Sequence, residues 1–247
     1  MFKISIFVPI YYRDELVKHC LTSLKYTDTK DLHVTLNLGL NGARQSFIKD
    51  FLESYISEVK GTVFADVNVF DPGENIGKGK IVNHMARTLN DFDYLVSIDS
   101  DMEMIDGGWL KNFINIFTHA DMKIGALCSN QINNSFHKIS DCKKVVIEKF
   151  SVVCTPGNIG IAGGVMITPF AVWANIGGYK ANKIFGDDDT TYATDCFIRG
   201  LVMGYVDEIE FFHPTDDDID YLHWKSKAKS NKLDYYENDG YYEVSRY

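Results

Sequence analysis

The first hundred residues alternate between short apolar runs and amphipathic segments. The apolar runs are rich in β-branched and aromatic residues, end at turn-forming or polar residues, and predict strands at 3–10, 32–42, 62–70 and 93–99. Between them, apolar side chains recur at helical spacing and predict helices at 13–27, 46–59 and 79–91. Strands and helices that alternate in this way predict an α/β fold, with a mostly parallel central sheet and helices on both faces.

The second half of the chain is less regular. Apolar runs predict strands at 123–132 and 145–154, a run flanked by glycine-containing turns lies at 157–169, and a helix is predicted from residue 194 to Gly204. From about residue 216 the chain becomes acidic, aromatic and lysine-bearing. This change predicts a main domain at 1–215 and a closing segment or lid of the same domain at 216–247.

Composition narrows the class of protein. With 247 residues, of which 45% are hydrophobic, the chain is long enough to bury a large core. Neither a membrane-length apolar run nor a secretory signal is evident, so we expect no integral membrane segment and a cytoplasmic location, in a bacterial or virus-infected host cell. Five scattered cysteines without a C-x-x-C pair argue against a disulfide framework or a zinc site. The net charge of -9 leaves nucleic-acid binding possible but does not favour it.

Two carboxylates lie at the carboxyl end of the fourth predicted strand, at Asp99 and Asp101. In open parallel sheets, ligands bind outside the carboxyl ends of the strands. Mg²⁺ and Mn²⁺ are commonly held there by one or two carboxylates together with substrate phosphates. A turn at the strand end would bring Asp101 onto such an ion and leave Asp99 to reach a ribose or a metal-bound water. The alternative is that these acids cap a helix or solvate a turn.

Over residues 1–205, five features stand in one order. They are "ISIFVPIYYRDELVKHCLTSL", "ENIGKGKIVNHM", the "DSD" at 99–101, "IAGGVMITPFAVWANIGGY" and "FGDDDTTYATDCFIRGLVMGY". Together they resemble the family-two glycosyltransferases of the GT-A fold. The resemblance implies a Rossmann-like nucleotide-sugar-binding domain.

The resemblance also implies an activity. A sugar would move from a nucleoside diphosphate sugar, with a UDP-sugar favoured, to an acceptor hydroxyl with inversion, and Mn²⁺ or Mg²⁺ would serve as cofactor. The acceptor could be a glycan, a protein or a modified nucleobase. The alternatives are a phage-type transferase acting on modified DNA bases and a non-catalytic domain that binds sugar nucleotides. A nucleotidyltransferase is disfavoured because "VPIYYRDE" contains no glycine.

The general base is expected among three consecutive acids, Asp187, Asp188 and Asp189. The family pattern maps most simply onto Asp188, whereas alignment backward from Gly204 makes Asp195 the corresponding acid. The alternative is that these acids solvate a loop at a helix N-terminus, where the helix dipole favours them.

The predicted donor site draws on several segments. Tyr11 would stack on the base and Arg13 would bind a phosphate. The full predicted set is Pro9, Tyr11, Arg13, Asn41, Asn75, Lys78, Lys80, Asp99, Ser100 and Lys225. Leu40 stands where the family usually has an acid. "GENIGKGK" lacks the spacing of a phosphate loop, which argues against an ATPase.

The remaining predictions concern the metal and the acceptor. The metal ligands are predicted to be Asp101, Asp99 and His223, with His213 as the competitor of His223, because imidazole beside carboxylates suits Mn²⁺. The acceptor side is expected to include Gly163, Gly164 and Trp173, which lie in the glycine-rich feature.

Overall fold

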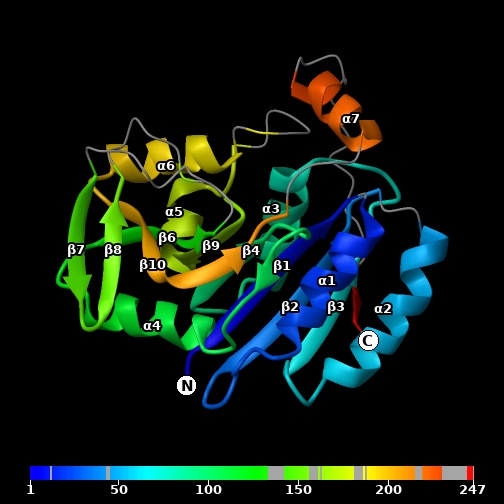
Figure 1. Cartoon of the computed structure of the whole chain (residues 1–247), viewed down its shortest axis with the longest axis horizontal. Helices are drawn as coiled ribbons and strands as arrows, with labels where there is room; N and C mark the ends of the chain where they lie inside the picture. Colours follow the sequence, from blue (N-terminus) through cyan, green and yellow to red (C-terminus); the bar gives the residue numbers. More distant parts are fainter. Residues whose placement is uncertain are drawn as a thin grey trace.

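The computed structural model is a mixed α/β domain built on a single sheet (Figure 1). It describes residues 1–11, 13–42, 45–132, 142–155, 161, 163–180, 186, 188–214, 219–229 and 244–246. Its strands are β1 (Lys3–Ile10), β2 (His33–Leu40), β3 (Asp66–Phe70), β4 (Tyr94–Ile98), β5 (Glu103–Met104), β6 (Ile124–Gln131), β7 (Lys143–Ile147), β8 (Phe150–Cys154), β9 (Val165–Pro169), β10 (Val202–Phe212) and β11 (Val244–Arg246). Its helices are α1 (Asp14–Leu24), α2 (Gln45–Val59), α3 (Lys78–Leu89), α4 (Trp109–His119), α5 (Phe170–Ile176), α6 (Asp188–Ile198) and α7 (Ile219–Lys229).

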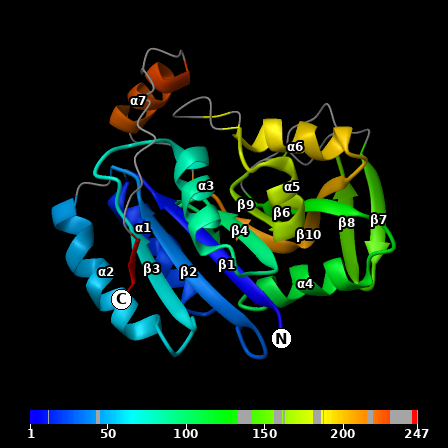
Figure 2. The same cartoon turned by 180° about the vertical axis from the view of Figure 1, so that it is seen from behind.

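The sheet has a parallel core with antiparallel additions. Its strand order is β11-β3-β2-β1-β4-β9-β6-β10-β8-β7, and β5 pairs with β10. Strands β3, β2, β1 and β4 run parallel, as the alternating pattern predicts, while β9 enters antiparallel between β4 and β6. The parallel strands therefore bring their carboxyl ends to one edge, which α7 overlies in both views (Figures 1 and 2).

Helices cover both faces of the sheet, as predicted. Alternate side chains of β1 explain why: Ile4, Ile6 and Val8 belong to one buried cluster with α1, α2 and α4, whereas Phe7 belongs to another with α3, α5 and α6. Figure 2 shows α3 crossing the face opposite to α1. Within the described residues, no helix combines the length and apolarity needed to span a membrane.

Two predictions in the second half are wrong. Residues 145–154 do not form one strand, because the left-handed Glu148 (φ 53°) turns the chain between β7 and β8. The helix predicted to Gly204 ends at Ile198, and the left-handed Gly200 (φ 69°) precedes β10. Pairing of β10 with β6 and β8 overrides the helical spacing, and a Cβ on Gly204 would lie 2.7 Å from the Val153 carbonyl oxygen.

Hydrogen-bonded polar side chains lie inside the parallel core. Asn37 in β2 donates through Nδ2 to Ser5 Oγ at 2.9 Å and to the Ile6 carbonyl at 3.0 Å. Its Oδ1 accepts a hydrogen bond from Asn68 Nδ2 in β3 at 2.8 Å. These side chains are buried, so the bonds satisfy groups that would otherwise be costly to remove from water.

Candidate functional site

The site begins at the carboxyl end of β4, where the chain turns. The Met102 amide donates to the Asp99 carbonyl at 3.0 Å, and the Asp99 amide donates to the Gly164 carbonyl at 2.7 Å. The first bond closes a turn over residues 99–102, and the second ties this turn to the segment before β9. The two carboxylates therefore leave the strand on a turn and meet different partners.

Asp101 lies between a guanidinium and an imidazole. Arg13 Nη1 is 3.1 Å from Asp101 Oδ2, and His213 Nε2 is 3.7 Å from the same oxygen. Arg13 precedes α1 in a left-handed conformation (φ 63°), which is uncommon for a residue with a side chain. His213 directly follows β10, whose end pairs with β5 just beyond Asp101. The pairing of two short strand ends thus places the imidazole beside the carboxylate.

Asp99 and Asp188 share the ammonium group of Lys78. Lys78 Nζ is 2.5 Å from Asp99 Oδ1 and 3.9 Å from Asp188 Oδ2. Burial raises the pKa of Asp99 to about 7, although the Lys78 charge opposes that rise. Burial likewise raises the pKa of Asp188 against the same charge. For Lys78, burial favours a lower pKa, but the two carboxylates outweigh it and hold the pKa well above its usual value.

Gly163 and Gly164 pack closely against this cluster. The Gly163 amide donates to Asp189 Oδ2 at 2.9 Å, and Lys78 Nζ donates to the Gly163 carbonyl at 3.1 Å. A Cβ on Gly164 would lie 2.8 Å from Met102 Sδ, so a side chain here would require Met102 to shift. The predicted acceptor-side glycines therefore adjoin both the DSD turn and the start of α6.

Trp173, which the sequence analysis assigns to the acceptor side, lies in the buried core. It is 3% exposed and packs against Tyr179 and Tyr192, with ring centroids 4.4 and 5.2 Å away. It supports the core behind the site and does not reach an open surface.

The candidate general bases, which are the acids at 187–189 and the alternative Asp195, occupy different environments. Asp187 lies outside the described residues. Asp188 is in the site, and its Oδ2 is buried without a hydrogen-bond partner in the described part of the chain. Asp195 is instead held by Lys180 Nζ at 2.8 Å and lies 3.8 Å from Arg199 Nη1. These ion pairs give Asp195 a structural environment within α6.

The predicted donor residues lie around the carboxyl ends of β1 and β2. Asn41 Nδ2 donates to Asn75 Oδ1 at 2.8 Å, and Asn41 Oδ1 accepts from the Ile76 amide at 2.8 Å. These bonds hold the segment before α3 against the end of β2, where Leu40 is the last residue. The other predicted donor residues are Pro9 in β1, Lys80 in α3 and Ser100 in the turn.

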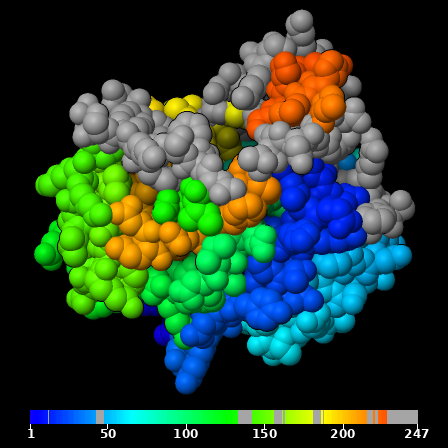
Figure 3. All heavy atoms as spheres, in the orientation of Figure 1, coloured from blue at the N-terminus to red at the C-terminus, as the bar shows by residue number. Residues whose placement is uncertain are grey.

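Helix α7 reaches this region through an aromatic contact that the sequence patterns did not indicate. The rings of Tyr11 and Trp224 have centroids 4.6 Å apart. Trp224 lies between His223, which is exposed, and Lys225, which is half-buried. In the space-filling view, α7 stands above the N-terminal strands and α1 (Figure 3). The only available signal was an aromatic residue within the basic stretch "LHWKSK".

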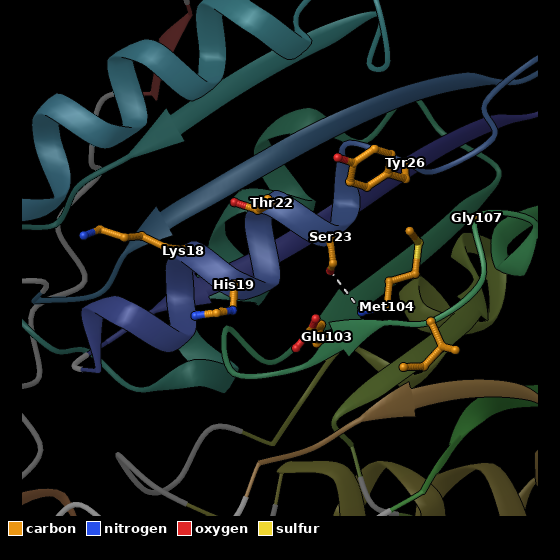
Figure 4. A pocket seen from close by; sticks show the side chains of 9 residues that line it. Lys18, His19, Thr22, Ser23, Tyr26, Glu103, Met104 and Gly107 are labelled. Atoms are coloured by element: carbon orange, nitrogen blue, oxygen red, sulfur yellow. Dashed lines mark hydrogen bonds between the residues drawn. The ribbon is translucent and has the colours of Figure 1, made fainter.

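A hollow of about 440 Å³ lies beside the site, between α1 and β5 (Figure 4). His19 and Glu103 line it, and Tyr26 lines its other end. The Met104 amide donates to Ser23 Oγ at 2.9 Å, which fixes β5 against α1 along this hollow. The hollow thus adjoins the segment that follows Asp101.

The donor atoms around Asp101 fit a divalent cation that a substrate helps to bind. Asp101 Oδ1 is buried and has no hydrogen-bond partner among the described residues. Carboxylate oxygen with imidazole nitrogen is a donor set that suits Mn²⁺. No group of three or more His, Cys, Asp or Glu residues in the described ranges could hold a metal by itself. Phosphate oxygens and water would therefore have to complete the coordination.

Solved structures resemble this fold. Mannosyltransferase PcManGT from Pyrobaculum calidifontis, in complex with GDP-Man and Mn²⁺, matches with a TM-score of 0.66 and 15% identity over 92% of this chain and 61% of that chain. TarS 1–349 from S. aureus, in complex with UDP-GlcNAc, matches with a TM-score of 0.63 and 13% identity over 87% and 59% of the two chains. GalNAc-T7 with UDP, GalNAc and Mn²⁺ matches with a TM-score of 0.61 and 12% identity over 86% and 44%.

The sequence comparisons give no such match. No protein-family model matches the chain, and no curated protein matches it in sequence. The chain spans about three fifths or less of the length of the three solved structures. The agreement lies in the arrangement of helices and strands: the chain has the GT-A fold of these glycosyltransferases.

Proposed function

We propose that this chain transfers a sugar from a nucleoside diphosphate sugar to an acceptor hydroxyl, with inversion and with a divalent cation. The observation that carries the proposal is the gathering of Asp99, Asp101 and Asp188 at one sheet edge, together with Arg13 and Lys78. Opposed charges in this arrangement suit a ligand that is itself a diphosphate paired with a cation. The likeness to structures bound to GDP-Man and UDP-GlcNAc supports the same substrate class.

On the donor side, each residue has a distinct part. Arg13 and Lys78 would bind diphosphate oxygens, for which cationic donors are well suited. Asp101 and His213 would hold the cation, because the geometry favours His213 over the exposed His223. When bound, the cation would offset the charge that grows on the leaving diphosphate. Arg13 would first have to release Asp101 Oδ2.

Residues 216–247 would close the donor site. Within this segment, α7 contacts Tyr11 through Trp224, at the place where the base of the donor is expected to stack. The same segment contributes β11, which pairs with β3 and therefore belongs to the main sheet. Two attachments of this kind favour a closing segment over a separate domain.

On the acceptor side, Asp188 would take the proton of the attacking hydroxyl. Its side chain is 12% exposed, so an acceptor would displace little bulk water from it. Lys78 balances the charge of the ionised form, which a general base needs before the reaction. Glycan acceptors are the first to test, because the net charge of -9 does not favour nucleic acid.

The test is a panel of nucleoside diphosphate sugars, with UDP-sugars first, assayed for hydrolysis and transfer by mass spectrometry with Mn²⁺ or EDTA. We expect Asp101→Ala to abolish Mn²⁺-dependent turnover. We expect Asp188→Asn to lower the transfer rate by about 100- to 10,000-fold while donor affinity stays nearly unchanged. Asp207→Asn is a matched control, because Asp207 pairs with Lys144 on the surface at 2.7 Å.

Four results would each oppose a part of the proposal. Absence of binding and turnover for every donor would reject glycosyl transfer. Full activity in EDTA would reject the cation. Retained anomeric configuration in the product would reject single displacement, and the largest pure rate loss at Asp195 would move the base there.

A further inference from the structure

We propose that Lys78 and Asp189, which hydrogen-bond to the carbonyl and the amide of Gly163, fix the position of Asp188. Asp189 is a positioning residue, since it need not touch the reacting atoms, and Lys78 has this positioning role in addition to its proposed binding of diphosphate. The inference rests on the proposed function only in that it takes Asp188 to be the general base. We call the three residues Lys78, Gly163 and Asp189 the glycine clamp.

The contacts of the glycine clamp are direct. The Gly163 amide donates to Asp189 Oδ2 at 2.9 Å, and the Gly163 carbonyl accepts from Lys78 Nζ at 3.1 Å. A Cβ at position 163 would lie 2.9 Å from the Cβ of Asp189, which is closer than real Cβ atoms approach. Glycine is therefore required at position 163 for Asp189 to come this near.

The glycine clamp joins the two halves of the site. Asp188 and Asp189 are the first residues of α6, so a displacement of Asp189 moves its neighbour with it. Lys78 also lies 2.5 Å from Asp99 Oδ1, and the Asp99 amide donates to the Gly164 carbonyl at 2.7 Å. The donor-side carboxylate and the base are thus fixed to the same short stretch of backbone.

The position of Asp188 explains why the glycine clamp matters. Its Oδ2 lies 3.9 Å from Lys78 Nζ and has no hydrogen-bond partner among the described residues. The carboxylate is instead held by the backbone amides of Asp188 and Asp189, so its position depends on where the first turn of α6 lies. A displacement of about 1 Å at a reacting group can cost about 100-fold in rate. The hydrogen bond from the Gly163 amide to Asp189 fixes this first turn, and with it the carboxylate of Asp188.

The closing experiment has a structural part that needs no activity. Hydrogen exchange of the Gly163 amide is compared in wild type, Asp189→Ala and Asp189→Asn, because an Asn side-chain oxygen can still accept the bond. We expect exchange to rise about 10-fold or more in Asp189→Ala and to stay within about 3-fold in Asp189→Asn. A thermal double-mutant cycle of Asp189→Ala with Lys78→Met should be non-additive, since both act on one residue.

Gly163→Ala provides a second perturbation of the same contact from the other side, in case Asp189→Ala fails to fold. It should raise exchange across the first turn of α6. Asp207→Ala, which removes a surface acid paired with Lys144, should leave the exchange of that turn unchanged. Unaltered Gly163 exchange in Asp189→Ala, or an additive cycle, would overturn the glycine clamp.

The catalytic part separates this inference from the proposed function. Asp189→Ala should lower kcat for transfer by about 10- to 100-fold, with the donor KM within about 3-fold, and Asp189→Asn should restore most of the rate. A loss in KM alone would overturn the positioning role. If wild type turns over no donor, the proposed function fails, whereas the exchange and the thermal cycle still decide whether the clamp exists.

Discussion

Replacing Arg13 with Gln should make the nucleotide-free protein bind Mn²⁺ more tightly. In the structure the guanidinium lies 3.1 Å from Asp101 Oδ2, the oxygen that also faces His213. A cation can take this oxygen only after Arg13 leaves it. The free energy of that ion pair is therefore subtracted from the free energy of metal binding.

The size of the effect follows from the burial of the pair. The side chains are 7% and 18% exposed, so solvent screens the pair less than a surface ion pair. A hydrogen bond to a charged group contributes about 1.5 to 3 kcal/mol. Since 1.4 kcal/mol is a factor of ten in affinity, Arg13→Gln should tighten Mn²⁺ binding about 10- to 100-fold. Gln carries a Cβ as Arg does, so the left-handed backbone bears the same steric cost in both.

The assay is calorimetric or electron-spin titration of Mn²⁺ into the protein, with and without nucleoside diphosphate. Arg13→Gln should strengthen binding of the metal alone yet weaken binding of the diphosphate, because the same guanidinium serves the second ligand. Arg87→Gln is the control, because Arg87 is an exposed arginine of α3 whose guanidinium donates to the Gly177 carbonyl at 3.3 Å and makes no contact with Asp101 in the described contacts. Unchanged or weaker Mn²⁺ binding in nucleotide-free Arg13→Gln would refute the reasoning.

Three further predictions concern the metal, the core and the pH profile. His213→Ala should weaken Mn²⁺ binding in the presence of diphosphate by about 10- to 100-fold, and His223→Ala should leave it nearly unchanged. A large loss of Mn²⁺ affinity in His223→Ala with none in His213→Ala would instead make His223 the ligand. Tyr192→Phe should lower the free energy of unfolding, measured by chemical denaturation, by about 1 to 2 kcal/mol. Thr168 Oγ1 donates its hydrogen to the Gly125 carbonyl, so in its 2.8 Å contact with the Tyr192 hydroxyl it must be the acceptor, and the substitution removes that bond. An unchanged denaturation midpoint would contradict this bond. Because burial raises the pKa of Asp188, its base form is lost at a higher pH than that of an exposed aspartate. The acid limb of kcat should therefore lie above that of an exposed aspartate and vanish in Asp188→Asn. An acid limb retained in that variant would assign the titration to another group.

The parallel core could be predicted from sequence because each of its strands is a mainly apolar run between helices. The strand predicted at 62–70 begins later, at Asp66, since Lys60 and Phe64 form a separate bridge before it. The hairpin at Glu148 could not be foreseen, because the turn carries neither Gly nor Asn. The sequence pattern predicts a helix over the first residues of β10, 202–204, because the pairing of this strand with β6 and β8 depends on distant segments.

In the site, too, features set by neighbouring residues could be predicted, whereas contacts between segments distant in sequence could not. The turn that separates Asp99 from Asp101 is local, and the residues themselves indicate it. The placement of His213 depends on pairing of β5 with β10, which joins residues far apart in sequence, so sequence reasoning left it as the competitor of His223. The shared ammonium of Lys78 likewise depends on how α3 and α6 meet at the sheet edge.

The buried amides of Asn37 and Asn68 bear on how strands find their alignment. A slip of β2 by two residues along β1 would keep its apolar faces unchanged, so hydrophobic burial alone discriminates weakly against it. Such a slip would place Thr35 or Gly39, instead of Asn37, opposite Phe7, and neither side chain could make the amide bonds that Asn37 makes to Ser5 and Ile6. The penalty for those unpaired groups selects one register. These polar residues therefore fix how far β1, β2 and β3 project at their carboxyl ends relative to one another, and with it where the segments that follow these strands begin.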